Sequence, residues 1–286
     1  MTMPLTDWSD AKGRSLPPTA IILFGFLPLG IMLLLALFGP FLLTVNPNSQ
    51  ALSAAYAPPS AEYLLGADNL GRSIAARLIA GTRISLGIAI AGVLASLATG
   101  LALGFLAAFH GGWTRQLIMR VSDVIIACPS LLFVILVSGL FGGGIGPILF
   151  GLWMSQWPGF ARLTAAITAR ELASDHVEAS RLLGFRAAYI FRTHVLPAIA
   201  PYLTSLGALT IGANVLTISS VGFLGLGLRP PDAEWGAMIA GTMTFFRTHP
   251  HMVLAPAVAI LICTLSATLI GEYYSARRQG IEEIVA

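Results

Sequence analysis

Six long apolar runs constrain this chain more than any other feature of its sequence. They cover approximately residues 19–43, 84–109, 117–141, 144–166, 200–225 and 252–274. A helix needs about 20 predominantly apolar residues to cross the hydrocarbon core of a bilayer, and each run meets that length. The runs are continuous and do not alternate with period two, which excludes a transmembrane β-barrel. The sequence therefore predicts an all-α integral membrane protein with six transmembrane helices.

The overall composition agrees with this prediction and excludes other classes. Only 10% of the 286 residues are charged and the mean hydropathy is +0.82, whereas soluble domains carry about 25% charged residues. The net charge of +3 is dispersed, without a basic tract that would indicate nucleic-acid binding. Cys128 and Cys263 both lie in apolar runs, so we expect neither a disulfide framework nor a CxxC metal site.

Motifs for catalysis are missing from the sequence. A GxxxxGK phosphate-binding loop does not occur, so this chain is not expected to hydrolyse ATP. Neither an HExxH motif nor a GxSxG nucleophile elbow occurs, which argues against an intramembrane enzyme. We therefore expect no enzymatic activity and no cofactor in this chain.

The distribution of basic residues predicts an orientation in the membrane. The polar segment 1–18 is expected to be a cytoplasmic tail, because the apolar run after it is too long for a cleaved signal peptide. The inner side then receives Lys12, Arg14, Arg115, Arg120, Arg162, Arg170, Arg181, Arg186, Arg192, Arg277 and Arg278, and the outer side Arg72, Arg77, Arg83, Arg229 and Arg247. This excess on the inner side predicts that both termini are cytoplasmic.

These expectations divide the chain into five parts. The parts are a tail at 1–18, a first transmembrane helix at 19–43, an outer loop at 44–83, a five-helix core at 84–274, and a cytoplasmic tail at 275–286. The outer loop is expected to contain a short amphipathic helix from Ser73 to Thr82, where Arg77 and Arg83 would hold it at the membrane interface. A second outer loop, 226–251, is expected to contain a short helix near 235–246.

A charged segment at 167–197 interrupts the apolar pattern between the fourth and fifth runs. An arginine-bearing insert of about 35 residues does not belong in hydrocarbon, so it is expected to lie in water beside the membrane. Its apolar and charged residues have helical spacing around 174–185. Gly184 is expected to turn the chain, and Pro197 suits the first turn of the next helix.

The spacing within this segment resembles the EAA loop of ATP-binding-cassette (ABC) importer permeases. The sequence EASRLLG occupies 178–184 and HVLP follows at 194–197, with matching residues at Glu178, Ala179, Gly184, Leu196 and Pro197. Ser180 and His194 depart from the pattern, which has alanine and a hydrophobic residue there. The resemblance implies that the partner ATPase transmits force through Glu178, Ala179, Ser180, Arg181, Leu183, Gly184, Phe185, Leu196 and Pro197.

Two further passages are similar to the dipeptide, oligopeptide and nickel branch of these permeases. LGADNLGR at 65–72 continues to RLIAGTRISL at 77–86, and GFLGLG at 222–227 continues to PPDAEWGAM at 230–238. Ser73 replaces the acidic residue usual in the branch. The sequence after GEYY at 271–274 also departs from the branch's usual ending, which leaves the role of this tail open.

The resemblance implies the ABC type I importer permease fold, with six transmembrane helices and a cytoplasmic coupling helix. It also implies a bacterial inner (cytoplasmic) membrane location and the partners of such an importer. These are a homologous second permease, two ATPase subunits that bind ATP and Mg, and an extracytoplasmic solute-binding protein. Di- and oligopeptides are the first expectation for the substrate, and nickel or a metal chelate is the alternative. A secondary transporter is a remote alternative, because acidic residues are nearly missing from the middle of the spans.

Polar residues within the spans have two interpretations that the sequence leaves open. Asn214, Thr217, Ser220, Ser138 and Gln156 could line a translocation path or could form hydrogen bonds between helices. Arg120 and Asp123, three residues apart, could form an ion pair on one helix face. In the second outer loop, His249 and His251 are weak candidates for a metal site, since imidazole binds nickel, but two histidines in a loop are more often inert.

Overall fold

The structure, a computed structural model, describes residues 21–42 and 45–285. Within these residues the chain is helical and contains no strand, which confirms the predicted all-α class. The elements are the π-helical turn η2 (Ile22–Phe26), α2 (Leu27–Leu42), η3 (Leu52–Ala54), α3 (Ile74–His110), α4 (Gly112–Ile126), α5 (Ser130–Leu140), α6 (Ile145–Leu172), α7 (Asp175–Leu182), α8 (Ala187–Ile190), the π-helical segment η4 (Phe191–Val195), α9 (Leu196–Phe223), α10 (Trp235–Thr242), η5 (Met243–Phe245) and α11 (His251–Val285).

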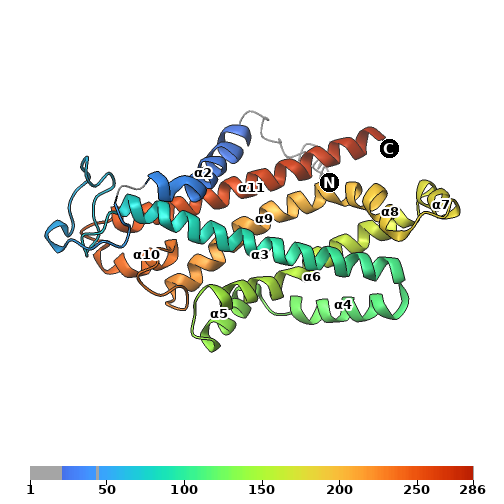
Figure 1. The fold of residues 1–286 in the computed structure, drawn as a ribbon, viewed down its shortest axis with the longest axis horizontal. Helices are drawn as coiled ribbons and strands as arrows, with labels where there is room; N and C mark the ends of the chain where they lie inside the picture. Colours follow the sequence, from blue (N-terminus) through green and yellow to red (C-terminus); the bar gives the residue numbers. More distant parts are fainter. Residues whose placement is uncertain (1–20, 43–44, 286) are drawn as a thin grey trace, which may run out of the picture.

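The long helices α3, α6, α9 and α11 run along the long axis of the molecule (Figure 1). The short helix α7 lies at one end of this bundle, and α10 lies at the other end together with the segment 45–73 (Figure 1). The segment after α6 and the segments before α3 and after α9 are therefore separated by the length of the bundle. This is the separation expected if the bundle crosses a membrane.

Four described helices are long and apolar enough to cross a membrane by length and composition. They are Ile22–Gly39, Ile74–His110, Ala187–Phe223 and His251–Ala276, and the bent pair α4 and α5 would make a fifth. The helix α6 is not among them, so the total of six spans stays a prediction. The segment 1–18 lies outside the described residues.

The expectation of one helix over 117–141 is wrong. α4 ends at Ile126 and α5 begins at Ser130, with an angle of 80° between them. Pro129 explains the break, because proline has no N–H to donate and disfavours helical geometry in Cys128 before it. The two halves enclose a corner in which α4 and α5 face α6.

The amphipathic helix expected over Ser73 to Thr82 is the first part of α3 rather than a separate element. Ser73 caps α3, since its hydroxyl oxygen accepts a hydrogen bond from the Ala76 N–H at 3.4 Å. At 37 residues α3 is about 55 Å long, whereas the hydrocarbon core is about 30 Å thick. The first turns of α3 can therefore lie outside the hydrocarbon while the rest of the helix spans it.

Small residues bring α3 and α6 into close contact. A side chain carbon added at Gly100 would overlap Phe160, and one added at Gly104 would overlap the Ala161 carbonyl oxygen. These two glycines, four residues apart, form the spacing that permits close helix packing in membranes. Between α4 and α6, Asp123 forms an ion pair with Arg162, so the expected pairing of Asp123 with Arg120 is wrong.

Candidate functional site: the α7 loop and the bundle behind it

The helix α7 is anchored to the bundle through one face. Val177 is fully buried in an apolar cluster that includes Ile190, Val195 and Ile199 from the start of the following helices. Asp175 lies in the first turn of α7, where a negative charge is favoured by the helix dipole. The location and approximate bounds of the helix expected around 174–185 are thus confirmed as local structure.

Gly184 ends α7 in a Schellman motif. Its φ is +82°, its N–H donates to the Arg181 carbonyl at 2.9 Å, and the Phe185 N–H donates to the Ser180 carbonyl at 3.1 Å. Glycine is favoured at this position because the left-handed backbone is strained for residues with a Cβ. A Cβ at this position would have no neighbour within 4 Å, so the requirement for glycine inside this chain is conformational.

The side of α7 away from the bundle is an exposed surface with an apolar centre. We call it the tip surface; it comprises Glu178, Ala179, Arg181, Leu182, Leu183, Gly184 and Phe185. Leu182 and Leu183 are 83% and 76% exposed, and Phe185 stacks on Tyr189 with ring centroids 4.2 Å apart. Contiguous exposed apolar side chains of this kind mark a protein–protein interaction site. Leu182 is a member that sequence reasoning missed.

The two residues that depart from the EAA pattern contact each other. The Ser180 hydroxyl and the His194 Nε2 are 3.0 Å apart, and the same hydroxyl donates to the His176 carbonyl at 2.9 Å. Ser180 is buried and His194 is half-buried. This contact joins α7 to η4, across the turn that Gly184 makes, and neither residue alone would have suggested it.

Leu196 and Pro197 lie behind the tip surface and not on it. They form the first turn of α9, as expected for Pro197. Leu196 is half-buried and Pro197 is exposed, next to the fully buried Val195. Their position suits a role in joining the α7 loop to α9 rather than direct contact with a partner.

The five polar residues considered for a translocation path do not form one line. Asn214 is fully buried; its side-chain N–H donates to the Ala89 carbonyl of α3 at 3.1 Å, and its oxygen accepts from Gln156 of α6. The hydroxyls of Thr217 and Ser220 donate to carbonyls one turn earlier in their own helix. The buried Ser138 hydroxyl has no partner among the described residues. Gln156 lines a cavity between α4, α5, α6 and α9.

That cavity lies where the α4–α5 corner faces α6 and α9. It has a volume of about 440 Å³, is largely open, and is lined by Ile126 and Ser130 from the corner, Ser155 and Gln156 from α6, and Thr210 from α9, with neighbouring apolar residues.

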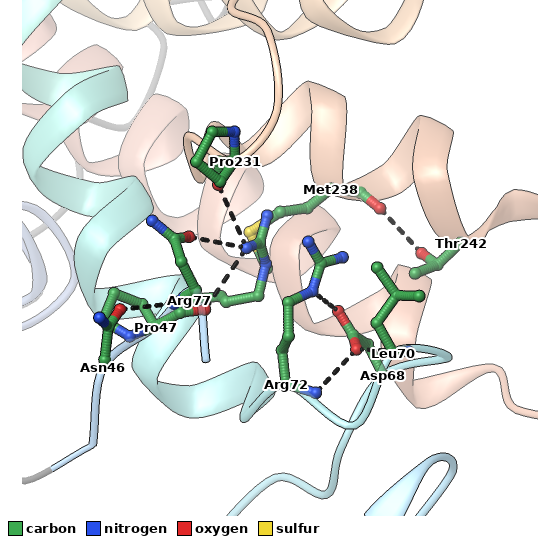
Figure 2. A network of polar contacts seen from close by, with 10 residues as sticks. Asn46, Pro47, Asp68, Leu70, Arg72, Arg77, Pro231, Met238 and Thr242 are labelled. Atoms are coloured by element: carbon green, nitrogen blue, oxygen red, sulfur yellow. Dashed lines mark hydrogen bonds and ion pairs between the residues drawn. The ribbon is translucent and has the colours of Figure 1, made fainter. Parts of the chain in front are cut away.

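At the opposite end of the bundle, two arginines organise the outer segments (Figure 2). Arg72 forms an ion pair with Asp68 at 2.6 Å. Arg77 is 6% exposed and donates to the Pro47 carbonyl, the Asn48 side chain and the Pro231 carbonyl at 3.2–3.4 Å. The expectation that Arg77 holds α3 at the membrane interface stays a prediction; in the structure its guanidinium joins the segment before α3 to the segment after α9.

Glu234 is a buried carboxylate that sequence reasoning missed. It caps α10 by accepting from the Gly236 and Ala237 N–H groups, each at 2.8 Å, and also accepts from Ser85 of α3 and Ser219 of α9. Burial raises the pKa of this carboxyl, and the hydrogen bonds oppose that shift. Glu234 therefore ties α10 to α3 and α9. A single acidic residue in a predicted loop carries no local pattern that would signal these contacts.

His249 and His251 lie near each other but do not form a metal centre with further ligands. Their ring centroids are 6.1 Å apart, and His249 packs on Tyr56 at 4.7 Å. Within residues 21–42 and 45–285, no group of three or more His, Cys, Asp and Glu side chains could hold a metal ion.

A bundle of long apolar helices with an exposed loop helix at one end is the architecture of a polytopic membrane protein, and comparisons with known proteins identify the family. Residues 100–280 match the family described as "Binding-protein-dependent transport system inner membrane component". The chain belongs to this family, whose members similar to this chain are permeases and not enzymes.

Curated relatives place the chain within the family. It is 35% identical to the di/tripeptide transport system permease protein DppC of Pseudomonas aeruginosa, over 87% of this chain and 84% of that protein. It is 35% identical to the glutathione transport system permease protein GsiD of Pectobacterium atrosepticum, over 75% and 71%. It is 33% identical to the nickel transport system permease protein NikC of Escherichia coli, over 85% and 88%. The chain is thus an ABC importer permease of the peptide, glutathione and nickel group.

A solved structure supports the fold. A chain of the MetNI methionine ABC transporter, in an inward-facing conformation, matches with a TM-score of 0.56 and 17% sequence identity, over 70% of this chain and 95% of that one. This likeness confirms that the bundle has the fold of an ABC transporter permease.

Proposed function

We propose that this chain is a permease subunit that moves di- and oligopeptides across the cytoplasmic membrane, energised by separate ATPase subunits. The observation that carries the proposal is the tip surface, which is apolar at its centre and lies at one end of the bundle. An exposed surface of this kind is suited to a groove in a partner, and the family resemblance makes that partner an ATPase. A homologous second permease, two ATPases with ATP and Mg, and an external binding protein complete the proposed complex.

The proposed orientation places both termini and α7 in the cytoplasm. It rests on the excess of basic residues on the inner side and on the positions of α7 and α10 at opposite ends of the bundle (Figure 1). The segment 45–73 and α10 would then face the binding protein. The proposed division into a first helix at 19–43, an outer loop at 44–83 and a core at 84–274 follows from the same orientation.

The mechanism would be alternating access driven through α7. ATP closes the two ATPases, and the tip surface moves with them. Val177 and the contact between Ser180 and His194 connect this movement to the start of α9. Coupling requires that the tip surface contact the ATPase differently in the inward-open and outward-open states. A partner bound equally well in both states would not change the equilibrium between them.

Peptide is the first candidate because two of the three relatives are named for the transport of di/tripeptides and of glutathione, which is itself a tripeptide. The relatives do not decide the matter, since the peptide and nickel permeases are 35% and 33% identical to this chain. Nickel or a metal chelate stays the second candidate, favoured by the pair His249 and His251.

Reconstitution in proteoliposomes tests the proposal. The complete transporter would be supplied with ATP and either radiolabelled trialanine or nickel chloride, with a complex containing a hydrolysis-deficient ATPase as the control. ATP-dependent uptake of trialanine that the control abolishes is the expected result. Uptake that persists with the deficient ATPase would refute the importer, and uptake of nickel alone would refute the peptide assignment and direct mutagenesis to the two histidines.

A further inference from the structure

Arg77 carries a buried positive charge whose hydrogen bonds all go to uncharged groups. Its side chain is 6% exposed, and its Nη1 donates to the Pro47 carbonyl, the Asn48 side-chain oxygen and the Pro231 carbonyl. Among the ion pairs of the described residues, none includes Arg77. Buried charges in proteins are normally paired, because an uncompensated charge away from water is costly. The described residues therefore do not supply the carboxylate that a buried guanidinium usually has.

The acidic residues nearby do not compensate this charge. Asp68 is 3% exposed, and its oxygens accept from the Leu70 N–H, the Arg72 N–H and the Arg72 Nε. Its charge is thus matched by the charge of Arg72. Asp232 is exposed and forms no ion pair within residues 45–285, so water and salt screen it. The charged neighbours that act on Arg77 are Arg72 and Asp68, which together are neutral.

The Arg77 guanidinium also has one edge without a partner. A guanidinium has five N–H donors, and neither Nε nor Nη2 of Arg77 makes a hydrogen bond within the described part of the chain. These nitrogens are not among the fully buried atoms that lack a partner, so they retain accessible surface. Arg72 uses its Nε for Asp68 and leaves Nη1 and Nη2 in the same state. Two nitrogens on one edge of a guanidinium match the two oxygens of a carboxylate.

Both arginines line a small cavity at the end of the bundle opposite α7. Its volume is about 100 Å³, and its wall includes Asp68, Arg72, Arg77, Asp232 and Met238. Figure 2 shows the guanidinium groups of Arg72 and Arg77 next to each other, beside Met238 of α10. A water takes about 30 Å³ of liquid volume, so the cavity suits a group of a few heavy atoms.

The charge and shape of this wall select the kind of group. Two arginines and the one buried aspartate leave a single positive charge, which one negative charge matches. A dianion such as phosphate would also be repelled by the carboxylates of Asp68 and Asp232 in the wall. A spherical ion such as chloride would not use the two parallel donors of a guanidinium edge, whereas a planar carboxylate would.

We propose that this cavity binds a carboxylate group, held by the Nε and Nη2 of Arg77 with the adjacent Arg72 guanidinium. The carboxylate comes from a small free anion such as acetate or from an acidic side chain of the external binding protein. The second source rests on the proposed function, in which the segment 45–73 and α10 face that protein. The site itself goes beyond that function, because it requires neither transport nor a peptide.

Binding of trifluoroacetate to the permease complex in lipid nanodiscs tests the site directly. The line width in fluorine NMR would be followed during a titration at constant ionic strength, with acetate, chloride and neutral acetamide as competitors. The native chain would be compared with Arg77→Lys, which keeps the charge but removes the two-nitrogen edge. Arg83→Lys is the matched control, since Arg83 is an exposed arginine of α3 that lines a different cavity.

Trifluoroacetate should bind saturably to the native complex, and acetate should displace it while acetamide should not. Arg77→Lys should weaken binding by about tenfold or more, the value of one charge-assisted hydrogen bond, and Arg83→Lys should leave it unchanged. Equal binding by native and Arg77→Lys complexes would overturn the proposal, as would chloride competing as well as acetate. If Arg77→Lys does not assemble, Arg72→Lys, which keeps a cation beside Asp68, should weaken binding in the same assay.

The affinity of the binding protein for the complex, measured with and without acetate, identifies the source of the carboxylate. An acidic side chain in the cavity predicts that acetate lowers this affinity for the native complex and not for Arg77→Lys. A free anion predicts that acetate binds without changing the affinity. Failure of the complex to import trialanine with ATP would overturn the proposed function and leave the carboxylate site standing, because the titration needs no transport.

Discussion

Substitutions at Gly184 distinguish strain within the α7 loop from contact with a partner. Gly184 has a φ of +82° and open space around its missing Cβ. Alanine at this position adds only backbone strain, about 1 kcal/mol, which lowers the equilibrium constant for forming the turn about fivefold. Asparagine adopts the left-handed region more readily and should cost less. Aspartate does so too, but it adds a charge beside Leu182, Leu183 and Phe185.

If the ATPase covers the tip surface, the aspartate charge is buried without a partner. Such a charge costs about 3 kcal/mol or more, which corresponds to more than a hundredfold decrease in the equilibrium constant for binding the ATPase. We therefore expect uptake to fall in the order native, Gly184→Asn, Gly184→Ala and Gly184→Asp, with a sharp loss only in the last. The thermal unfolding of the purified complex should change little, because the substitution lies on an exposed turn.

Gly225 provides a matched control at the other end of the bundle. It has a φ of +76°, no neighbour within 4 Å of a Cβ, and the same two hydrogen bonds, from Gly225 to Gly222 and from Leu226 to Val221. Alanine at Gly225 should impose equal strain without weakening the association of the ATPase, measured by copurification. Normal ATP-driven uptake by Gly184→Asp would refute the assigned role of the loop.

Further predictions concern the contacts around the site and the outer end. Ser180→Ala removes two hydrogen bonds, to the His176 carbonyl and to His194, and His194→Leu removes the second of these; each bond is worth about 1 kcal/mol, and each variant should lower coupled uptake. The double variant restores the apolar family pattern and should recover part of the loss, whereas additive losses would contradict the proposed contact. Glu234→Ala removes the cap of α10 and leaves two buried hydroxyls without their acceptor, so it should lower the free energy of unfolding by about 2–4 kcal/mol in detergent. Because burial raises the pKa of Glu234, the folded state binds the proton of this carboxyl more tightly than the unfolded chain does. The protonated carboxyl therefore stabilises the fold at acidic pH, and this contribution is lost as the pH rises through the raised pKa. Glu234→Gln should abolish this decrease of the melting temperature with rising pH. Arg77→Ala removes the contacts that one guanidinium nitrogen makes with Pro47, Asn48 and Pro231 and should make the segment 45–73 more sensitive to protease, while Ala at the exposed Arg83 should not.

Much of the architecture was predictable because apolar length and proline and glycine positions are local properties. The all-α class, the helix near 174–185, the helix near 235–246 and the turn at Gly184 all followed from spacing within a few residues. The break between α4 and α5 was accessible in principle, since Pro129 lies within the run 117–141. The run was nevertheless read as one helix, because the mean hydropathy over 117–141 stays high and carries no information on the direction of the helix axis.

Contacts between distant segments were not predictable in the same way. Arg77 was assigned to the membrane interface because an arginine near a helix start often lies there. Its burial depends on Pro47 and Pro231, which are 30 and 154 residues away in sequence. Asp123 similarly pairs with Arg162 on α6 and not with the neighbour one turn away.

The sequence by itself determined that this chain is an apolar helical protein and, through three ordered motifs, the family of permeases to which it belongs. It did so because hydrophobic length and motif spacing are written along the chain. Only the tertiary structure decided that Ser180 meets His194, that Glu234 joins three helices, and that Asn214 connects α9 to α3 and α6. These properties depend on which side chains face one another after packing, and no local pattern specifies that.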